Sequence, residues 1–122
     1  MKKRPWPAKE NPLVAITYEL MEGFDQGGNP IYKQGLIESD KELETVQKIL
    51  EPLEPHPAMI TSVTMGKVNL KLMSGDEITL RPVFHPSLET YADLFKVENL
   101  DFEMPALLSD LLNRWRSSIS GA

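Results

Sequence analysis

Residues 12–37 read PLVAITYELMEGFDQGGNPIYKQGLI, with two apolar runs on either side of a polar, glycine-rich segment. The first run extends from Pro12 to about Met21 and the second from Ile31 to Ile37, and both have the β-branched and aromatic content of strands. The glycines between them allow positive φ, and Asp and Asn side chains stabilise turns through hydrogen bonds to the backbone. This stretch therefore predicts a β-hairpin with a long tip.

A helix is predicted directly after this hairpin. Ser39 and Glu42 match the capping-box spacing, in which each side chain bonds the other residue's backbone amide at a helix start. Leu43, Val46 and Leu50 then follow at spacings of three and four, which places them on one helical face. A group of prolines downstream ends the helix.

The middle of the chain predicts further strands. Alternation of apolar and polar residues indicates two more hairpins, the first turning at Ser74-Gly75-Asp76. Proline donates no backbone hydrogen bond, so Pro82 is expected at a sheet edge. The expected strands cover residues 59–65, 68–72, 78–81, 91–97 and 100–102.

A second helix closes the pattern, with Pro105 suited to its first turn. One apolar face is expected to contain Leu107, Leu108, Leu111, Leu112 and Trp115. The whole order is β-β-α-β-β-β-(β)-α. It predicts an α+β fold in which an antiparallel sheet of about five to six strands carries two helices on one face.

The length of 122 residues is that of one domain. We predict a mobile N-terminal arm over residues 1–11, a single domain over residues 12–117 and a frayed C-terminal tail over residues 118–122. Trp6 stands between two prolines in the arm. Two interpretations are open for it: folding back onto the domain, which we favour, or occupying a pocket on a partner.

Composition excludes several classes of function. The chain has no cysteine, which excludes disulfides, thiol chemistry and cysteine-ligated zinc. Residues 1–10 hold four basic groups and one acidic group, whereas the remainder holds nine and seventeen, so we expect no nucleic-acid binding. We also expect no membrane segment and a cytoplasmic location. The alternative is the soluble portion of an exported protein.

Enzymatic signals are sparse. His85 beside Ser87, Glu89 and Tyr91 is the one cluster with an imidazole near other reactive groups, so His85 and Tyr91 are the candidate catalytic residues. No histidine pair, calcium loop or phosphate-binding loop has the sequence context its chemistry needs. We therefore expect no cofactor and no metal site, and we favour a non-enzymatic protein.

Interaction signals are stronger than enzymatic ones. Large aromatics contribute most at interfaces, which makes Trp6, Phe24 and Trp115 the candidate anchors. Acidic residues could attract a basic partner. The acidic candidates are Glu98, Asp101 and Glu103.

The leading hypothesis is a binding or regulatory module that acts through protein–protein contacts. A homodimer formed through an exposed strand edge or a helix face is one version of it. Two alternatives remain open: a small-ligand binding protein or enzyme with its site near His85 and Tyr91, and a structural domain of a larger assembly.

Overall fold

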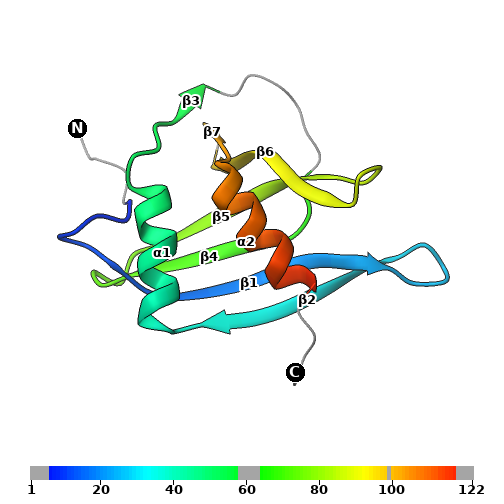
Figure 1. Cartoon of the computed structure of the whole chain (residues 1–122), viewed down its shortest axis with the longest axis horizontal. Helices are drawn as coiled ribbons and strands as arrows, with labels where there is room; N and C mark the ends of the chain where they lie inside the picture. Colours follow the sequence, from blue (N-terminus) through cyan, green and yellow to red (C-terminus); the bar gives the residue numbers. More distant parts are fainter. Residues whose placement is uncertain (1–5, 58–63, 99, 118–122) are drawn as a thin grey trace.

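The computed structural model describes residues 6–57, 64–98 and 100–117. It contains seven strands and two helices within these residues, arranged as in Figure 1. The elements are β1 (Leu13–Phe24), β2 (Pro30–Ile37), α1 (Asp40–Leu50), β3 (His56–Pro57), β4 (Lys67–Leu72), β5 (Glu77–His85), β6 (Thr90–Val97), β7 (Leu100–Glu103) and α2 (Ala106–Ser117).

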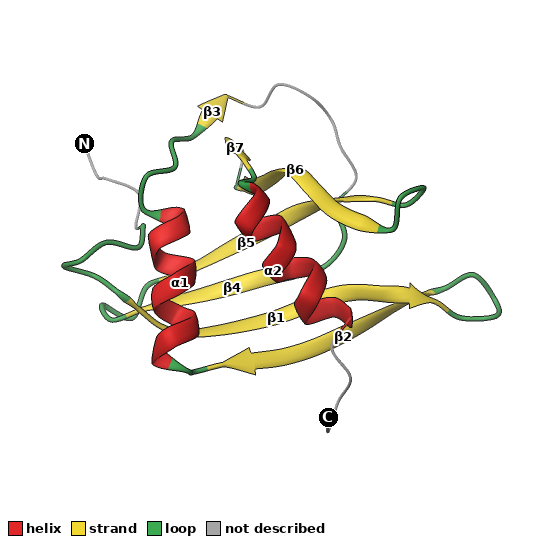
Figure 2. Cartoon of the chain, viewed as in Figure 1, coloured by secondary structure: helices red, strands yellow, loops and turns green. Residues whose placement is uncertain are grey.

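All strand pairs are antiparallel, and the sheet has the order β2-β1-β4-β5-β6-β7-β3. Both helices lie across the same face of this sheet, as Figure 2 shows. α1 contacts β1, and α2 contacts β1 and β6. We call this covered side the helix face and the other side the open face. The predicted α+β class, the antiparallel sheet and the element order are confirmed.

The predicted first hairpin is present and longer than expected, because β1 continues to Phe24. The helix start is also where the sequence indicates, with Ser39 in an extended N-cap conformation. The capping box itself is wrong, since no side-chain hydrogen bond caps this helix. Its first turn is closed by the backbone bond from Leu43 N–H to the Ser39 carbonyl.

The hairpins β4–β5 and β6–β7 confirm the predicted alternation, while most of the strand predicted at 59–65 lies outside the described residues. The edge position expected for Pro82 is wrong, because β5 lies between β4 and β6. The missing N–H of Pro82 is tolerated because the strand pairing of β5 is irregular at this residue. The β4–β5 ladder ends at Leu80, and the β5–β6 register shifts between Pro82 and Phe84.

The second helix buries Leu108, Leu111, Leu112 and Trp115 as predicted. Leu107 was assigned to the same face, but 66% of it is exposed. At about 100° per residue, Leu107 projects roughly 90° away from the centre of the buried face. Within the described residues, neither helix has the length and apolarity needed to cross a bilayer.

Residues 6–11 of the predicted arm pack against the domain. The Trp6 indole donates a hydrogen bond to the Leu50 carbonyl at 2.8 Å and stacks on Phe102 with ring centroids 4.7 Å apart. Asn11 exchanges hydrogen bonds with Ser74 in the β4–β5 turn. Trp6 thus folds back, as the favoured interpretation held. Residues 1–5 and the predicted tail lie outside the described residues.

Candidate functional site

The two candidate catalytic residues occupy neighbouring strands but opposite faces of the sheet. Tyr91 packs edge-on against Phe84 in the core, with ring centroids 4.9 Å apart. His85 follows Phe84 in β5, and successive strand residues point to opposite faces. The structure therefore does not bring the imidazole and the phenol together.

His85 instead faces Asp93, with its Nε2 2.8 Å from a carboxylate oxygen. This separation allows an ion pair when the imidazole is protonated. It does not meet hydrogen-bond geometry, and Nε2 has no hydrogen-bond partner among the described residues. Asp93 has a left-handed backbone with φ 73°, so it turns the strand locally. A base paired with an acid still needs a nucleophile, and Ser109 Oγ is already donating to the Tyr91 carbonyl at 2.6 Å.

The Tyr91 phenol has a structural role, because it fills a gap in the sheet. The β1–β4 ladder ends at the pair Glu19–Lys67, although β1 continues further. In the gap beyond this pair, the Tyr91 hydroxyl accepts a hydrogen bond from Met21 N–H at 2.8 Å and donates one to the Met65 carbonyl at 2.5 Å. Burial raises the pKa of Tyr91 to about 12.

Arg116 of α2 also binds the backbone of β1 at Met21. Its Nε donates to the Met21 carbonyl at 2.5 Å, and its Nη1 donates to the Glu89 carbonyl at 3.0 Å. The guanidinium carbon also lies 5.1 Å from the centre of the Phe84 ring, within cation–π range. With both Tyr91 and Arg116 committed to backbone atoms of β1, this region stabilises the fold.

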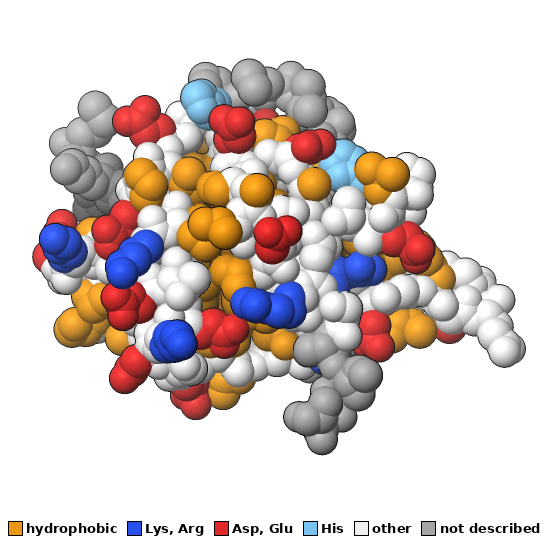
Figure 3. Space-filling view, viewed as in Figure 1, with side chains coloured by type: hydrophobic (Ala, Val, Ile, Leu, Met, Phe, Trp, Pro, Cys, Tyr) orange, Lys and Arg blue, Asp and Glu red, His pale blue; other side chains and the backbone are white. Residues whose placement is uncertain are grey.

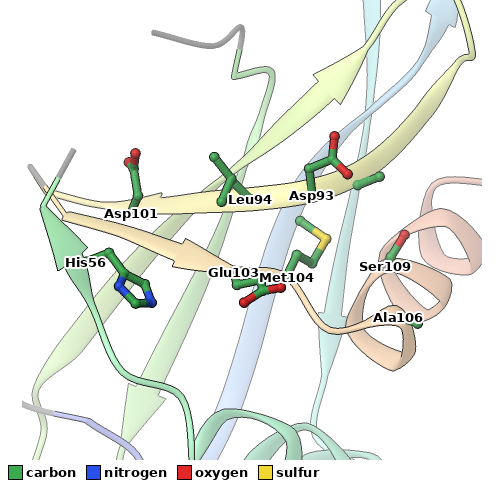
Figure 4. Close-up of a pocket in the computed structure, with 9 residues that line it drawn as sticks. His56, Asp93, Leu94, Asp101, Glu103, Met104, Ala106 and Ser109 are labelled. Atoms are coloured by element: carbon green, nitrogen blue, oxygen red, sulfur yellow. The ribbon is translucent and has the colours of Figure 1, made fainter. Parts of the chain in front are cut away.

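A hollow with a volume of about 760 Å³ lies beside β6, β7 and the start of α2. His56, Asp93, Asp101 and Glu103 are among its lining residues. In Figure 4 the carboxylates of Asp101 and Asp93 point to the opposite side from the His56 ring, and only that of Glu103 lies on the same side as the ring. Polar groups that bind one small molecule must converge on it, and these do not.

Asp101 is only 1% exposed, and Lys96 Nζ donates a hydrogen bond to it at 2.7 Å. This pairing offsets part of the cost of burying a carboxylate. The predicted acidic patch therefore loses its central member to the interior and leaves Glu98 and Glu103 exposed. Among the described residues, no group of three or more His, Asp or Glu side chains could hold a metal ion.

The three predicted aromatic anchors have different surroundings. Trp115 is 6% exposed and stacks on Tyr18 with ring centroids 5.4 Å apart, so it belongs to the core. Trp6 is half-buried against Phe102. Phe24, near the tip of the first hairpin, is 49% exposed. Phe24 is thus the aromatic candidate that remains available to a partner.

Phe24 belongs to a larger exposed feature, the hairpin formed by β1 and β2. β2 is the first strand of the sheet order and pairs only with β1 within the described chain. The end of this hairpin projects past the remaining strands, as Figure 1 shows. Ile31, Tyr32 and Leu36 of β2 are exposed large apolar residues. β2 therefore combines an unpaired backbone edge with apolar side chains, and we call residues 30–37 the edge strand.

The tip that joins the two strands is ordered by Asp25. Its carboxylate accepts hydrogen bonds from the backbone N–H groups of Gly27 at 2.8 Å and Asn29 at 2.9 Å. The bond from Asn29 is the main cause holding the pKa of Asp25 below its ordinary value. Gly28 supplies a positive φ of 82° between them. An ordered tip lowers the entropy lost when the hairpin binds a partner.

The middle of the edge strand depends on a glycine. Tyr18 is paired with Gly35, and its ring lies where a side chain on Gly35 would have to be. The same ring stacks on Trp115 of α2, which shows that Gly35 faces the helix side of the sheet. Alternation then places Lys33 and Ile37 on the helix face and Tyr32, Gln34 and Leu36 on the open face.

Sequence reasoning missed Ile31, Tyr32 and Leu36 because their pattern resembles any half-buried strand. Their exposure follows from the strand order, which places β2 at the end of the sheet. One signal was available: Lys33 and Gly35 interrupt the apolar residues, and central strands rarely contain both.

Figure 3 shows the helix side of the molecule, where basic and acidic side chains are interspersed and acidic groups gather over β7 and β3.

Comparison of the chain with protein-family models, curated proteins and solved structures found no significant match.

Proposed function

We propose that this chain is a non-enzymatic protein-binding module whose contact element is the β1–β2 hairpin. The edge strand would add to a strand of the partner, and its backbone N–H and C=O groups would extend the sheet. The exposed apolar side chains would provide the buried contacts. The observation that carries this proposal is that one side of β2 pairs with no strand among the described residues, together with the exposure of Ile31, Tyr32 and Leu36.

Two features of β2 support the proposal that its open edge pairs with another strand. Natural sheets protect their edges with charges, prolines and bulges, because an open edge promotes association. The edge strand carries a single charge, Lys33, and pairs with β1 without interruption from Tyr32 to Ile37. Pro30 stands only at its first position. The regular part of the strand is therefore open to pairing.

The small-ligand alternative has less support. Its expected residues, His85 and Tyr91, face opposite sides of the sheet, and the polar side chains described around the hollow at β6 and β7 are divided between two sides. The alternative of a structural domain in a larger assembly would use the same hairpin. It differs in requiring the partner for stability.

Site-specific photocrosslinking in cells that produce the chain naturally tests the proposal. A benzophenone amino acid at Leu36, which is 58% exposed on the edge strand, should give one discrete protein adduct. The matched control is the same amino acid at Leu88, which is 72% exposed in the β5–β6 turn and should give none. Tyr32→Lys should suppress the adduct at position 36. Equal adducts at both positions, or none at position 36, would contradict the proposal.

A further inference from the structure

We infer that the occupant of the edge strand is a second copy of this chain, paired antiparallel to the first about a two-fold axis at Gln34. This inference rests on the proposed function, because it names the partner of the same surface. Symmetric pairing of one strand with its own copy is necessarily antiparallel and joins two sheets into a continuous one.

Backbone geometry restricts the possible registers. Successive residues of a strand point their N–H and C=O groups to opposite edges. Only alternate residues of β2 therefore direct these groups toward a strand added at its open edge. A residue therefore pairs with a residue of the same parity in the other copy. The candidate axes consequently lie at individual residues, such as Tyr32, Lys33, Gln34, Gly35 or Leu36, and not between them.

Among these axes, Gln34 gives the best match of side chains. It places Tyr32 opposite Leu36 and Ile31 opposite Ile37, each twice by symmetry, while Gln34 lies opposite itself. Cross-strand pairs of aromatic and branched apolar residues are the favourable ones in antiparallel sheets. Every apolar residue from 31 to 37 then has an apolar partner.

The neighbouring axes are worse for identifiable reasons. An axis at Lys33 places two ammonium groups directly opposite each other, which is destabilising. An axis at Gly35 puts Lys33 opposite Ile37 and Tyr32 opposite Glu38, so apolar groups meet charges. Axes at Tyr32 or Leu36 shorten the overlap of the two strands. The charge and the apolar pattern of β2 thus favour one register.

Lys33, which would otherwise protect this edge, is accommodated in the Gln34 register. It lies opposite Gly35 of the other copy, which has no side chain of its own. The Tyr18 ring covers that glycine on the helix face. The lysine would therefore pack against the Tyr18 ring, an arrangement that suits a cation beside an aromatic group.

Net charge also favours this surface over others. Each copy has a formal charge of −5, so most mutual approaches bring acidic groups together. The edge strand is an exception, because its one charged residue is Lys33. The seven residues 31–37 that pair in this register extend over roughly 23 Å, enough for a continuous ladder of backbone hydrogen bonds.

Cysteine crosslinking of the purified chain tests both the dimer and its register, since the natural sequence contains no cysteine. In the proposed register, residues 34 of the two copies lie directly opposite, about 4.5–5.5 Å apart between Cα atoms, which suits a disulfide. Gln34→Cys should therefore oxidise to a covalent dimer. Leu36→Cys is the matched control, because its two copies would be more than about 13 Å apart.

We expect Gln34→Cys to form the disulfide about tenfold or more faster than Leu36→Cys, although Leu36 is the more accessible position. Sedimentation velocity of the natural sequence should show a dimer at raised concentration, and Tyr32→Lys should shift it to monomer. Equal crosslinking rates, or a faster rate for Leu36→Cys, would overturn the register. A natural chain that remains monomeric at every concentration would overturn the dimer.

Failure of this inference is distinguishable from failure of the proposed function. A monomer whose position 36 crosslinks to a different protein in cells refutes self-pairing and leaves the binding edge intact. A monomer without any adduct at position 36 refutes both.

Discussion

The hydroxyl of Tyr91 accepts a hydrogen bond from the Met21 backbone N–H at 2.8 Å, although β4 and β5 separate their strands in the sheet. The contact forms because β1 continues beyond the end of its ladder with β4. No strand of the described residues pairs with the backbone of Met21 on that side. A tyrosine from β6 and an arginine from α2 take the place of the missing strand. The projecting hairpin is therefore anchored to the core at its base.

Tyr91→Phe should destabilise the domain by about 2–4 kcal/mol, because it leaves the Met21 N–H and the Met65 carbonyl without the hydroxyl that serves both. The free energy of unfolding in urea measures this change. Tyr32→Phe is the control, since it removes a hydroxyl from an exposed ring and should change stability by less than about 0.5 kcal/mol. Equal effects of the two substitutions would contradict a bracing role for Tyr91.

Alkaline pH should weaken the fold through the same hydroxyl. The pKa of Tyr91 is raised to about 12 in the folded state by burial, against about 10 in an unfolded chain. Its contribution is therefore complete below pH ~10 and is lost as the pH rises toward 12. Urea midpoints across this window should fall more steeply for the natural sequence than for Tyr91→Phe. Parallel curves would show that Tyr91 does not carry this dependence.

Trp6→Ala should cost about 2–4 kcal/mol, because it removes both the stack on Phe102 and the hydrogen bond to the Leu50 carbonyl. Trp6→Phe separates the two contributions, as it keeps an aromatic ring but no donor, and should cost less. Thermal unfolding followed by circular dichroism reports both. A melting temperature unchanged in Trp6→Ala would return residues 6–11 to the status of a dispensable arm.

Leu111→Ala should cost about 2–5 kcal/mol, because it opens a cavity under α2. Leu107→Ala makes the same chemical change in the same helix at a side chain that is 66% exposed, so its effect should stay below about 0.5 kcal/mol. The difference between their denaturant midpoints measures which leucines face the core. A similar loss for both would mean that the buried face of α2 is wider than the structure shows.

The elements of this fold follow closely from local sequence patterns. The hairpin tip at Asp25, the N-cap position of Ser39 and the apolar face ending at Trp115 all depend on neighbours within a few residues. Errors occur where tertiary structure decides. Pro82 lies inside the sheet because the ladder of β4 has already ended, and no local pattern gives the length of a neighbouring strand.

The candidate site was less predictable, because it depends on strand order. Phe24 was identified from its place at a turn, but Ile31, Tyr32 and Leu36 become a surface only when β2 occupies the end of the sheet. Tyr91 shows the opposite case. Its position near His85 along the chain suggested chemistry, whereas the pleat separates the two side chains and the phenol is used by the backbone.

The aromatic stacks of Trp6 on Phe102 and of Tyr18 on Trp115 have a consequence for synthesis on the ribosome. Each joins one of the first 18 residues to a residue beyond position 100, so neither can form until β7 or α2 has emerged. At a synthesis rate of about 5–20 residues per second, the first hairpin exists for several seconds before α2 can pack on it. Contacts this distant in sequence also slow folding itself. During this interval the nascent hairpin presents both its open edge and the apolar side chains that the helices later bury.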